Sequence, residues 1–139
     1  RLIPLASLIT PNLPEAAALL DEPLAGDQAA IEDQGRRLLA LGCAAVLIKG
    51  GHGEGAESTD YLCTPTGTIA FTAKRVATKN THGTGCSLSS AVAAWLAKGE
   101  GMETAVRNAK AWLTAAIAAA DRFSVGHGHG PVHHFHNFY

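Results

Sequence analysis

The order of apolar and polar residues predicts alternating helices and strands. Apolar residues are continuous over residues 44–48, and a short run of this kind is typical of a strand buried on both faces of a parallel sheet. The run follows a predicted helix over residues 27–41, whose apolar side chains share one face. Asp27 can cap the start of this helix, and Gly42 stands where a left-handed residue would end it. A helix that leads directly into a buried strand favours an α/β fold.

The start of the chain combines an apolar run with a helix-capping pattern. Residues 2–9 are mostly apolar, and Pro11 disfavours a helix just before it. Asn12 can cap a short helix, and Glu15 stands three residues later, which is the spacing of a capping box. The sequence opens without Met and passes directly into the apolar run. We therefore expect residues 1–139 to be one portion of a single larger domain.

The rest of the chain is predicted to contain two short strands and two long helices, at residues 58–63, 68–74, 84–98 and 102–122. Pro65, Thr66 and Gly67 separate the two strands and indicate a hairpin. A glycine-rich loop, residues 49–55, follows the buried strand, and a second glycine loop precedes the first long helix. This order of strands, loops and helices again predicts an α/β domain.

Composition and charge exclude several classes of function. The net charge is −1, which argues against a nucleic-acid-binding surface or attraction to anionic membranes. No apolar stretch has the length of a bilayer span. Cys43, Cys63 and Cys86 form no C-x-x-C pair, which argues against a disulfide framework and a structural zinc site. We expect a cytoplasmic protein.

The second glycine loop carries the most informative candidate chemistry. Gly83, Thr84, Gly85 and Cys86 stand at the predicted start of a helix, where unpaired N–H groups and the helix dipole can bind an anion such as a transferring phosphoryl group. The same residues are also compatible with a tight turn into a helix. A thiol in the first helical turn is favoured as the thiolate, so Cys86 could remove a proton from a substrate hydroxyl. The alternative is a small buried cysteine, which is how Cys43 and Cys63 are interpreted.

The loop resembles a motif of the ribokinase-like superfamily. Members of this superfamily carry Asp-Thr and then G-x-G-D, whereas this chain has N-T-H-G-T-G-C at residues 80–86, with Cys86 in place of the aspartate. This exchange is similar to the hydroxymethylpyrimidine-phosphate kinase branch and to some closely related vitamin B6 kinases. The resemblance implies the C-terminal half of a three-layer α/β/α domain with a mostly parallel central sheet. It also implies that the N-terminal half of the domain, with most of the substrate pocket, lies outside residues 1–139.

Two further segments resemble the same family. Asn12 and Glu15 match its N-x-x-E motif, whose polar groups organise Mg²⁺ and phosphates, partly through waters. Lys49 follows the buried strand and precedes two glycines, as in the family, and would neutralise charge on the nucleotide phosphates. Read alone, Asn12 and Glu15 are also helix-capping residues, and Lys49 is also a solvated strand end.

The tail over residues 126–136 contains five histidines. Imidazoles are common ligands of transition metals, but their spacing here matches no defined site. The family often carries G-H-G-P-V-H-H at this place, so the tail is interpreted as family-typical structure. A metal-binding protein that uses this tail stays open as an alternative.

The resemblance implies a kinase that uses ATP and Mg²⁺ and phosphorylates 4-amino-5-hydroxymethyl-2-methylpyrimidine, its monophosphate, or both. In this hypothesis Lys49 and Cys86 are catalytic, and Cys86 deprotonates the hydroxymethyl group. The alternatives are a pyridoxine or pyridoxal kinase and a non-catalytic nucleotide-binding fragment. The partners expected are a small pyrimidine and a second copy of the complete chain, as a homodimer, with neither nucleic acid nor membrane.

Overall fold

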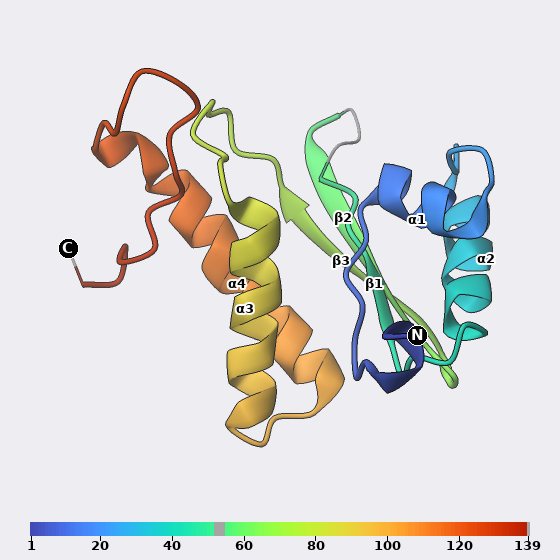
Figure 1. The fold of residues 1–139 in the computed structure, drawn as a ribbon. Helices are drawn as coiled ribbons and strands as arrows, with labels where there is room; N and C mark the ends of the chain where they lie inside the picture. Colours follow the sequence, from blue (N-terminus) through green and yellow to red (C-terminus); the bar gives the residue numbers. More distant parts are fainter. Residues whose placement is uncertain (52–54, 139) are drawn as a thin grey trace. The chain divides into compact units, whose positions relative to one another are not determined.

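The computed structural model describes residues 1–51 and 55–138, so His52, Gly53 and Glu54 of the first glycine loop lie outside the described residues. Two compact units divide the chain, Arg1–Lys74 and Arg75–Tyr139. Their elements are η1 (Ile3–Leu5), α1 (Leu13–Leu20), α2 (Gln28–Leu39), β1 (Val46–Ile48), β2 (Glu57–Thr64), β3 (Gly67–Lys74), α3 (Thr84–Ala97), α4 (Met102–Ala118) and η2 (Ala120–Arg122) (Figure 1). Within the described ranges, no helix combines the length and apolar character that crossing a bilayer requires.

The sheet of the first unit is antiparallel throughout. Its strand order is β1-β2-β3, with Val46 paired to Cys63 and Thr64 paired to Gly67. The two residues between Thr64 and Gly67 form the predicted hairpin, and a connection this short permits only antiparallel pairing. This sheet differs from the mostly parallel sheet that the resemblance implies. Parallel pairing occurs among the described residues as isolated bridges. Two of them involve the segment before α1: Ile9 pairs with Val46 of β1, and Asn12 pairs with Lys49, the residue after β1.

Helices α1 and α2 lie on the same side of this sheet (Figure 1). Leu38, Ile48 and Cys63 are almost fully buried where α2 meets β1 and β2. Gly35 allows α2 to approach the sheet closely, because a Cβ at this position would collide with the Cys63 thiol. Glycine inside a helix costs about 1 kcal/mol relative to alanine. The close contact between helix and strand therefore explains a residue that helix propensity alone would disfavour.

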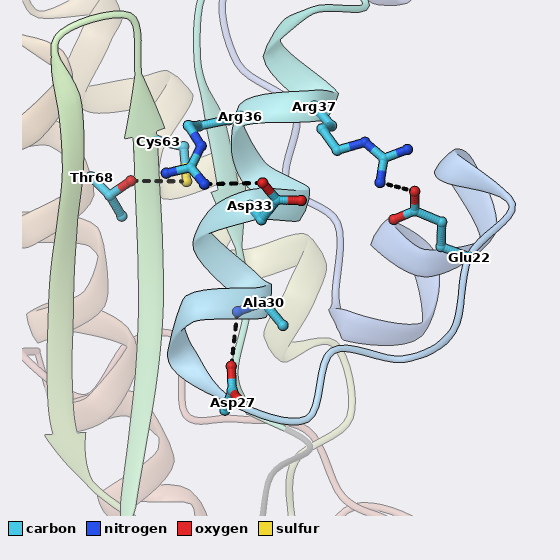
Figure 2. A network of polar contacts seen from close by, with 8 residues as sticks. All are labelled: Glu22, Asp27, Ala30, Asp33, Arg36, Arg37, Cys63 and Thr68. Atoms are coloured by element: carbon cyan, nitrogen blue, oxygen red, sulfur yellow. Dashed lines mark hydrogen bonds and ion pairs between the residues drawn. The ribbon is translucent and has the colours of Figure 1, made fainter.

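Polar contacts cap the start of α2 and lie along its exposed side (Figure 2). The Asp27 carboxylate accepts a hydrogen bond of 2.8 Å from the backbone N–H three residues on, which confirms the predicted cap. Arg37 pairs with Glu22, just beyond α1, and Arg36 pairs with Asp33 at 3.0 Å. Exposed pairs of this kind contribute about 1 kcal/mol or less each. The buried apolar residues therefore contribute more to the stability of this unit than the visible ion pairs do.

The second unit is built on two long helices. Helices α3 and α4 pack side by side and are joined by a short turn in which Gly99 has a φ of +91° (Figure 1). Half of the buried residues of α4 are small, namely Ala105, Ala109 and Ala116. The helix predicted to reach residue 122 ends as an α-helix at Ala118 and continues as the short η2 turn. The C-terminal segment beyond η2 is irregular.

Candidate functional site

Asn12, Glu15 and Lys49 lie together in the first unit. The Asn12 Oδ1 accepts from the Glu15 N–H at 2.8 Å, and the Glu15 Oε2 accepts from the Asn12 N–H at 2.7 Å. This reciprocal pair confirms the predicted capping box at the start of α1. Asn12 also forms a parallel bridge with Lys49, whose N–H donates to the carbonyl of Pro11 at 2.8 Å. Backbone pairing therefore brings the lysine beside the cap.

The charges of this group suit a phosphate-bearing ligand with a hard cation. The Lys49 Nζ is 3.9 Å from the Glu15 Oε2, and the lysine side chain is 18% exposed against 56% for the glutamate. A half-buried ammonium group can neutralise phosphate oxygens, and a carboxylate can bind Mg²⁺ or its waters. In the described ranges no three His, Cys, Asp or Glu side chains gather as a metal site. The carboxylate beside Lys49, that of Glu15, is an oxygen ligand of the kind Mg²⁺ takes while it keeps most of its waters.

Asp60 supports this group and was not identified from the sequence. Its carboxylate is 5% exposed and accepts a hydrogen bond of 2.9 Å from the N–H of Gly50, the residue after Lys49. A Cβ at Gly50 would collide with the Thr59 carbonyl. The backbone of Gly50, the residue after Lys49, therefore lies directly against β2. A charged residue inside a strand pattern was the only signal of this role in the sequence.

Gly83, Thr84, Gly85 and Cys86 lie together in the second unit, at the start of α3. Gly83 is the residue before the helix and has a φ of +80°, a left-handed conformation that favours glycine. Within the described part of the chain, no side chain caps this helix. The Thr84 N–H points to the carbonyl of Thr81 at 3.4 Å, and the first N–H bonded within the helix is that of Ser87, to the Gly83 carbonyl. The N–H groups of Gly85 and Cys86 come before that bond, and the helix dipole adds positive potential there. This arrangement can accept an oxyanion.

The three cysteines are free and differ in exposure. Cys86 is exposed, whereas Cys43 and Cys63 are 5% and 1% exposed. Burial raises the pKa of the Cys63 thiol, and it raises the pKa of Cys43 in the same direction. The interpretation of Cys43 and Cys63 as small buried residues is confirmed. Cys86 is the cysteine that a substrate could reach.

A groove of about 590 Å³ runs beside α3 in the second unit. The residues that line it include Cys86, Trp95, Trp112 and His134. The His134 Nε2 is 2.8 Å from the Ser87 hydroxyl, one residue after Cys86. No local pattern predicts this contact, because 47 residues separate its partners. The groove can receive an apolar or aromatic group next to the thiol.

A family profile decides the assignment of the chain. The profile described as phosphomethylpyrimidine kinase matches residues 1–133. The chain belongs to the phosphomethylpyrimidine kinase family.

Curated relatives of this family are similar over nearly the whole chain. The hydroxymethylpyrimidine/phosphomethylpyrimidine kinases of Escherichia coli strain K12 and Salmonella typhimurium are 57% and 60% identical over 136 residues, which is 98% of this chain and 51% of each relative. The corresponding protein of Rhizobium meliloti is 49% identical over 139 residues and is covered to 52%. The chain thus spans about half the length of the curated relatives it matches.

Solved structures similar to the chain include pyridoxal kinases. An ADP complex of Bacillus subtilis pyridoxal kinase is 34% identical with a TM-score of 0.90, over 98% of this chain and 52% of that one. The Staphylococcus aureus pyridoxal kinase with AMP-PCP is 28% identical with a TM-score of 0.91, over 99% and 50%. These likenesses confirm an α/β fragment that aligns to half of a ribokinase-like kinase.

The phosphomethylpyrimidine kinase motifs predicted from the sequence are distributed over both units. Asn12, Glu15 and Lys49 belong to the first unit, and the loop over residues 83–86 belongs to the second. Each group assembles as its local sequence pattern predicts. That the two groups act on one nucleotide stays a prediction.

Proposed function

We propose that this chain is the phosphate-handling portion of a kinase that transfers the γ-phosphoryl group of ATP to hydroxymethylpyrimidine, its monophosphate, or both. The observation that carries the proposal is the family match over residues 1–133 together with the exposed Cys86 thiol after the left-handed Gly83. The relatives at 57% and 60% identity are named as kinases of hydroxymethylpyrimidine and of phosphomethylpyrimidine. Two of the structural neighbours were solved with ADP or AMP-PCP, which supports ATP as the donor.

In the first unit, Lys49 places its ammonium group against the nucleotide phosphates and lowers the cost of bringing their charges together. Glu15 and Asn12 would hold Mg²⁺ through its waters, and the ion would supply further charge neutralisation. Asp60 keeps the residue after Lys49 against β2 through the N–H of Gly50. The half-buried position of Lys49 limits the directions in which its side chain can point.

In the second unit, the amides over residues 83–86 stabilise the charge on the transferring phosphoryl group. The Cys86 thiolate takes the proton from the substrate hydroxyl as the hydroxyl oxygen attacks the γ-phosphorus. The bond from that phosphorus to the β–γ bridging oxygen breaks, and ADP leaves with the electron pair. Phosphoryl transfer depends more on position and charge than on covalent chemistry, so the proposed reaction needs no covalent intermediate on the protein.

Substituting Cys86→Ala in the full-length protein tests this proposal. Removal of a general base costs on the order of a hundredfold or more in turnover. We expect that loss in a coupled assay of ADP release with hydroxymethylpyrimidine, whereas ADP binding measured by calorimetry stays close to wild type. The matched control is Cys43→Ala, the same change at a buried thiol of the first unit, which should retain turnover. Near-normal turnover of Cys86→Ala would remove Cys86 from the base role.

A pyridoxal kinase is the second candidate, because the structural neighbours with TM-scores of 0.90 and 0.91 are pyridoxal kinases. The identities of 57% and 60% to pyrimidine kinases, against 34% and 28% to pyridoxal kinases, favour the pyrimidine. Parallel kcat/KM measurements with hydroxymethylpyrimidine and pyridoxal separate the two. A preference for pyridoxal would reverse the assignment. Nucleotide binding with neither product would instead indicate a non-catalytic binding module.

The complete domain is proposed to be the three-layer α/β/α fold with a mostly parallel sheet, in a homodimer. Leu2 and Leu5 are each 82% exposed, and Leu24 is 58% exposed, which leaves apolar surface for further chain to cover. We expect residues 1–139 alone to be unstable or to assemble with the remaining segment or with another copy. Light scattering and thermal unfolding test this expectation, and a cooperatively folding monomer would contradict it.

A further inference from the structure

The C-terminal segment of the second unit returns to the residues that precede α3. His82 forms a parallel bridge with Pro131, and the His82 N–H donates to the carbonyl of Gly130 at 3.1 Å. The Nδ1 of His129 lies 3.0 Å from the carbonyl of Lys79. The segment immediately before the glycine loop is therefore paired with the tail along its backbone.

Asn80 joins this tail to the end of the α4 region. Its Oδ1 accepts from the Gly130 N–H at 3.0 Å, and its Nδ2 donates to the Asp121 Oδ1 at 2.7 Å. The Thr78 hydroxyl donates to the same Asp121 oxygen at 2.5 Å. An amide side chain can accept on one side and donate on the other, which a carboxylate cannot do when ionised. The position thus uses both ends of the asparagine side chain.

The fit around Asn80 is close. Gly130 is buried, and a Cβ at that residue would collide with the Asn80 Oδ1. The neighbouring Val132 is 1% exposed, so the tail is anchored by an apolar side chain as well as by hydrogen bonds. The tail is therefore packed against the loop entry.

The tail reaches the first turn of α3 as well. The His134 Nε2 lies 2.8 Å from the Ser87 hydroxyl, and the Ser87 N–H donates to the Gly83 carbonyl at 2.9 Å. His134 also packs near Trp112 of α4, with ring centroids 6.1 Å apart. The glycine loop is consequently bounded by tail contacts before it, at Asn80 and His82, and after it, at Ser87.

We propose that residues 129–134 form a clasp that fixes the shape of the glycine loop, with Asn80, Asp121 and His134 as positioning residues for the phosphoryl-binding amides. The proposal rests on the function proposed above for that loop. Glycine-rich loops have many accessible backbone conformations, and oxyanion-binding amides act only when they are held in the productive geometry. The clasp supplies this constraint from outside the loop.

Exchanging the amide of Asn80 and the carboxylate of Asp121 in the full-length protein tests the clasp. Asn80→Asp places two carboxylates together and should lower kcat by roughly tenfold, with the KM for ATP within about twofold of wild type, because a misplaced amide affects the transition state most. Asp121→Asn alone keeps an acceptor for Thr78 and Asn80 and should have a smaller effect. The double variant Asn80→Asp/Asp121→Asn restores one donor and one carboxylate, so kcat should recover to within about threefold of wild type.

Val106→Ala is the control for a purely structural effect. Val106 is fully buried in α4, so this change destabilises the unit without touching the loop. All variants are assayed at a temperature at which each is fully folded. If Asn80→Asp loses no more kcat than Val106→Ala, or if the double variant does not recover, the clasp does not position the loop.

Amide hydrogen exchange over residues 78–87 gives a second measurement that needs no catalysis. Exchange of the His82 N–H should be faster in Asn80→Asp and return toward wild type in the double variant. If the wild-type protein has no kinase activity, the proposed function fails and this measurement alone decides the clasp. Unchanged exchange in Asn80→Asp would overturn the clasp even in an active kinase.

Discussion

In the first unit, backbone pairing and a short-range helix cap hold the polar groups of the candidate site together. In the second unit, the contacts around the glycine loop join side chains that are far apart in sequence. Asn12 and Glu15 exchange hydrogen bonds across three residues, and an isolated parallel bridge with Asn12 adds Lys49. Asn80 instead contacts Asp121 and Gly130, which are 41 and 50 residues away. The first arrangement should form whenever its sheet forms. The second requires that the tail be in place.

The largest effect is expected from a change at Gly50, which joins Lys49 to β2. Gly50→Ala places a Cβ against the Thr59 carbonyl, which belongs to backbone and cannot rotate away. Overpacking of this kind costs about 2–3 kcal/mol, and we expect that loss in the free energy of unfolding measured with urea. We also expect weaker ADP binding, since Lys49 moves with its neighbour.

Gly51→Ala is the matched control for Gly50→Ala. A Cβ at Gly51 meets no atom within 4 Å, so the same substitution one residue later should leave stability within about 0.5 kcal/mol of wild type. Equal losses from both variants would show that loop flexibility, not the contact with Thr59, governs this site.

A smaller effect is expected from the cap of α1. Asn12→Ala removes the acceptor for the Glu15 N–H and should cost about 1 kcal/mol, whereas Asn12→Ser retains a capping oxygen and should cost a few tenths. Hydrogen exchange should become faster in α1 alone. Faster exchange throughout the first unit would indicate that the cap has more than a local role.

The smallest expected effect is a loss of stability at high pH caused by the buried thiols of the first unit. Burial raises the pKa of Cys63 and Cys43 above the ordinary value of 9.0, so the unfolded thiols ionise first as pH rises. The unfolded state then binds fewer protons than the folded state, and the free energy of unfolding falls above about pH 9. Urea titrations at pH 7 and pH 10 measure this loss, and Cys63→Ala should reduce it. A stability independent of pH in Cys63→Ala and wild type alike would contradict the assignment.

Much of the local structure could be predicted from sequence because its signals are short in range. The caps of α1 and α2, the hairpin between β2 and β3 and the left-handed Gly42 are confirmed. The exposure of Cys86 is consistent with its place in the glycine loop. Each of these depends on residues within a few positions of one another.

The remaining structure depends on pairings that no local pattern encodes. The antiparallel pairing of β1 with β2 differs from the parallel arrangement that the apolar run suggested, because a fully buried strand has the same composition in either pairing. Asp121 follows a long helix without any motif, and its role arises only where the chain folds back to Asn80. The contact between Ser87 and His134 was hidden for the same reason.

Because the cysteines differ in exposure, thiol labelling of the unmodified protein can measure local opening of the first unit. Cys43 and Cys63 are buried in the first unit, and Cys86 is exposed in the second. A thiol reagent should modify Cys86 directly, whereas modification of Cys43 and Cys63 should wait for partial unfolding of the first unit. Mass spectrometry of a labelling time course would then give the rate at which the first unit opens, with the direct labelling of Cys86 as the internal reference.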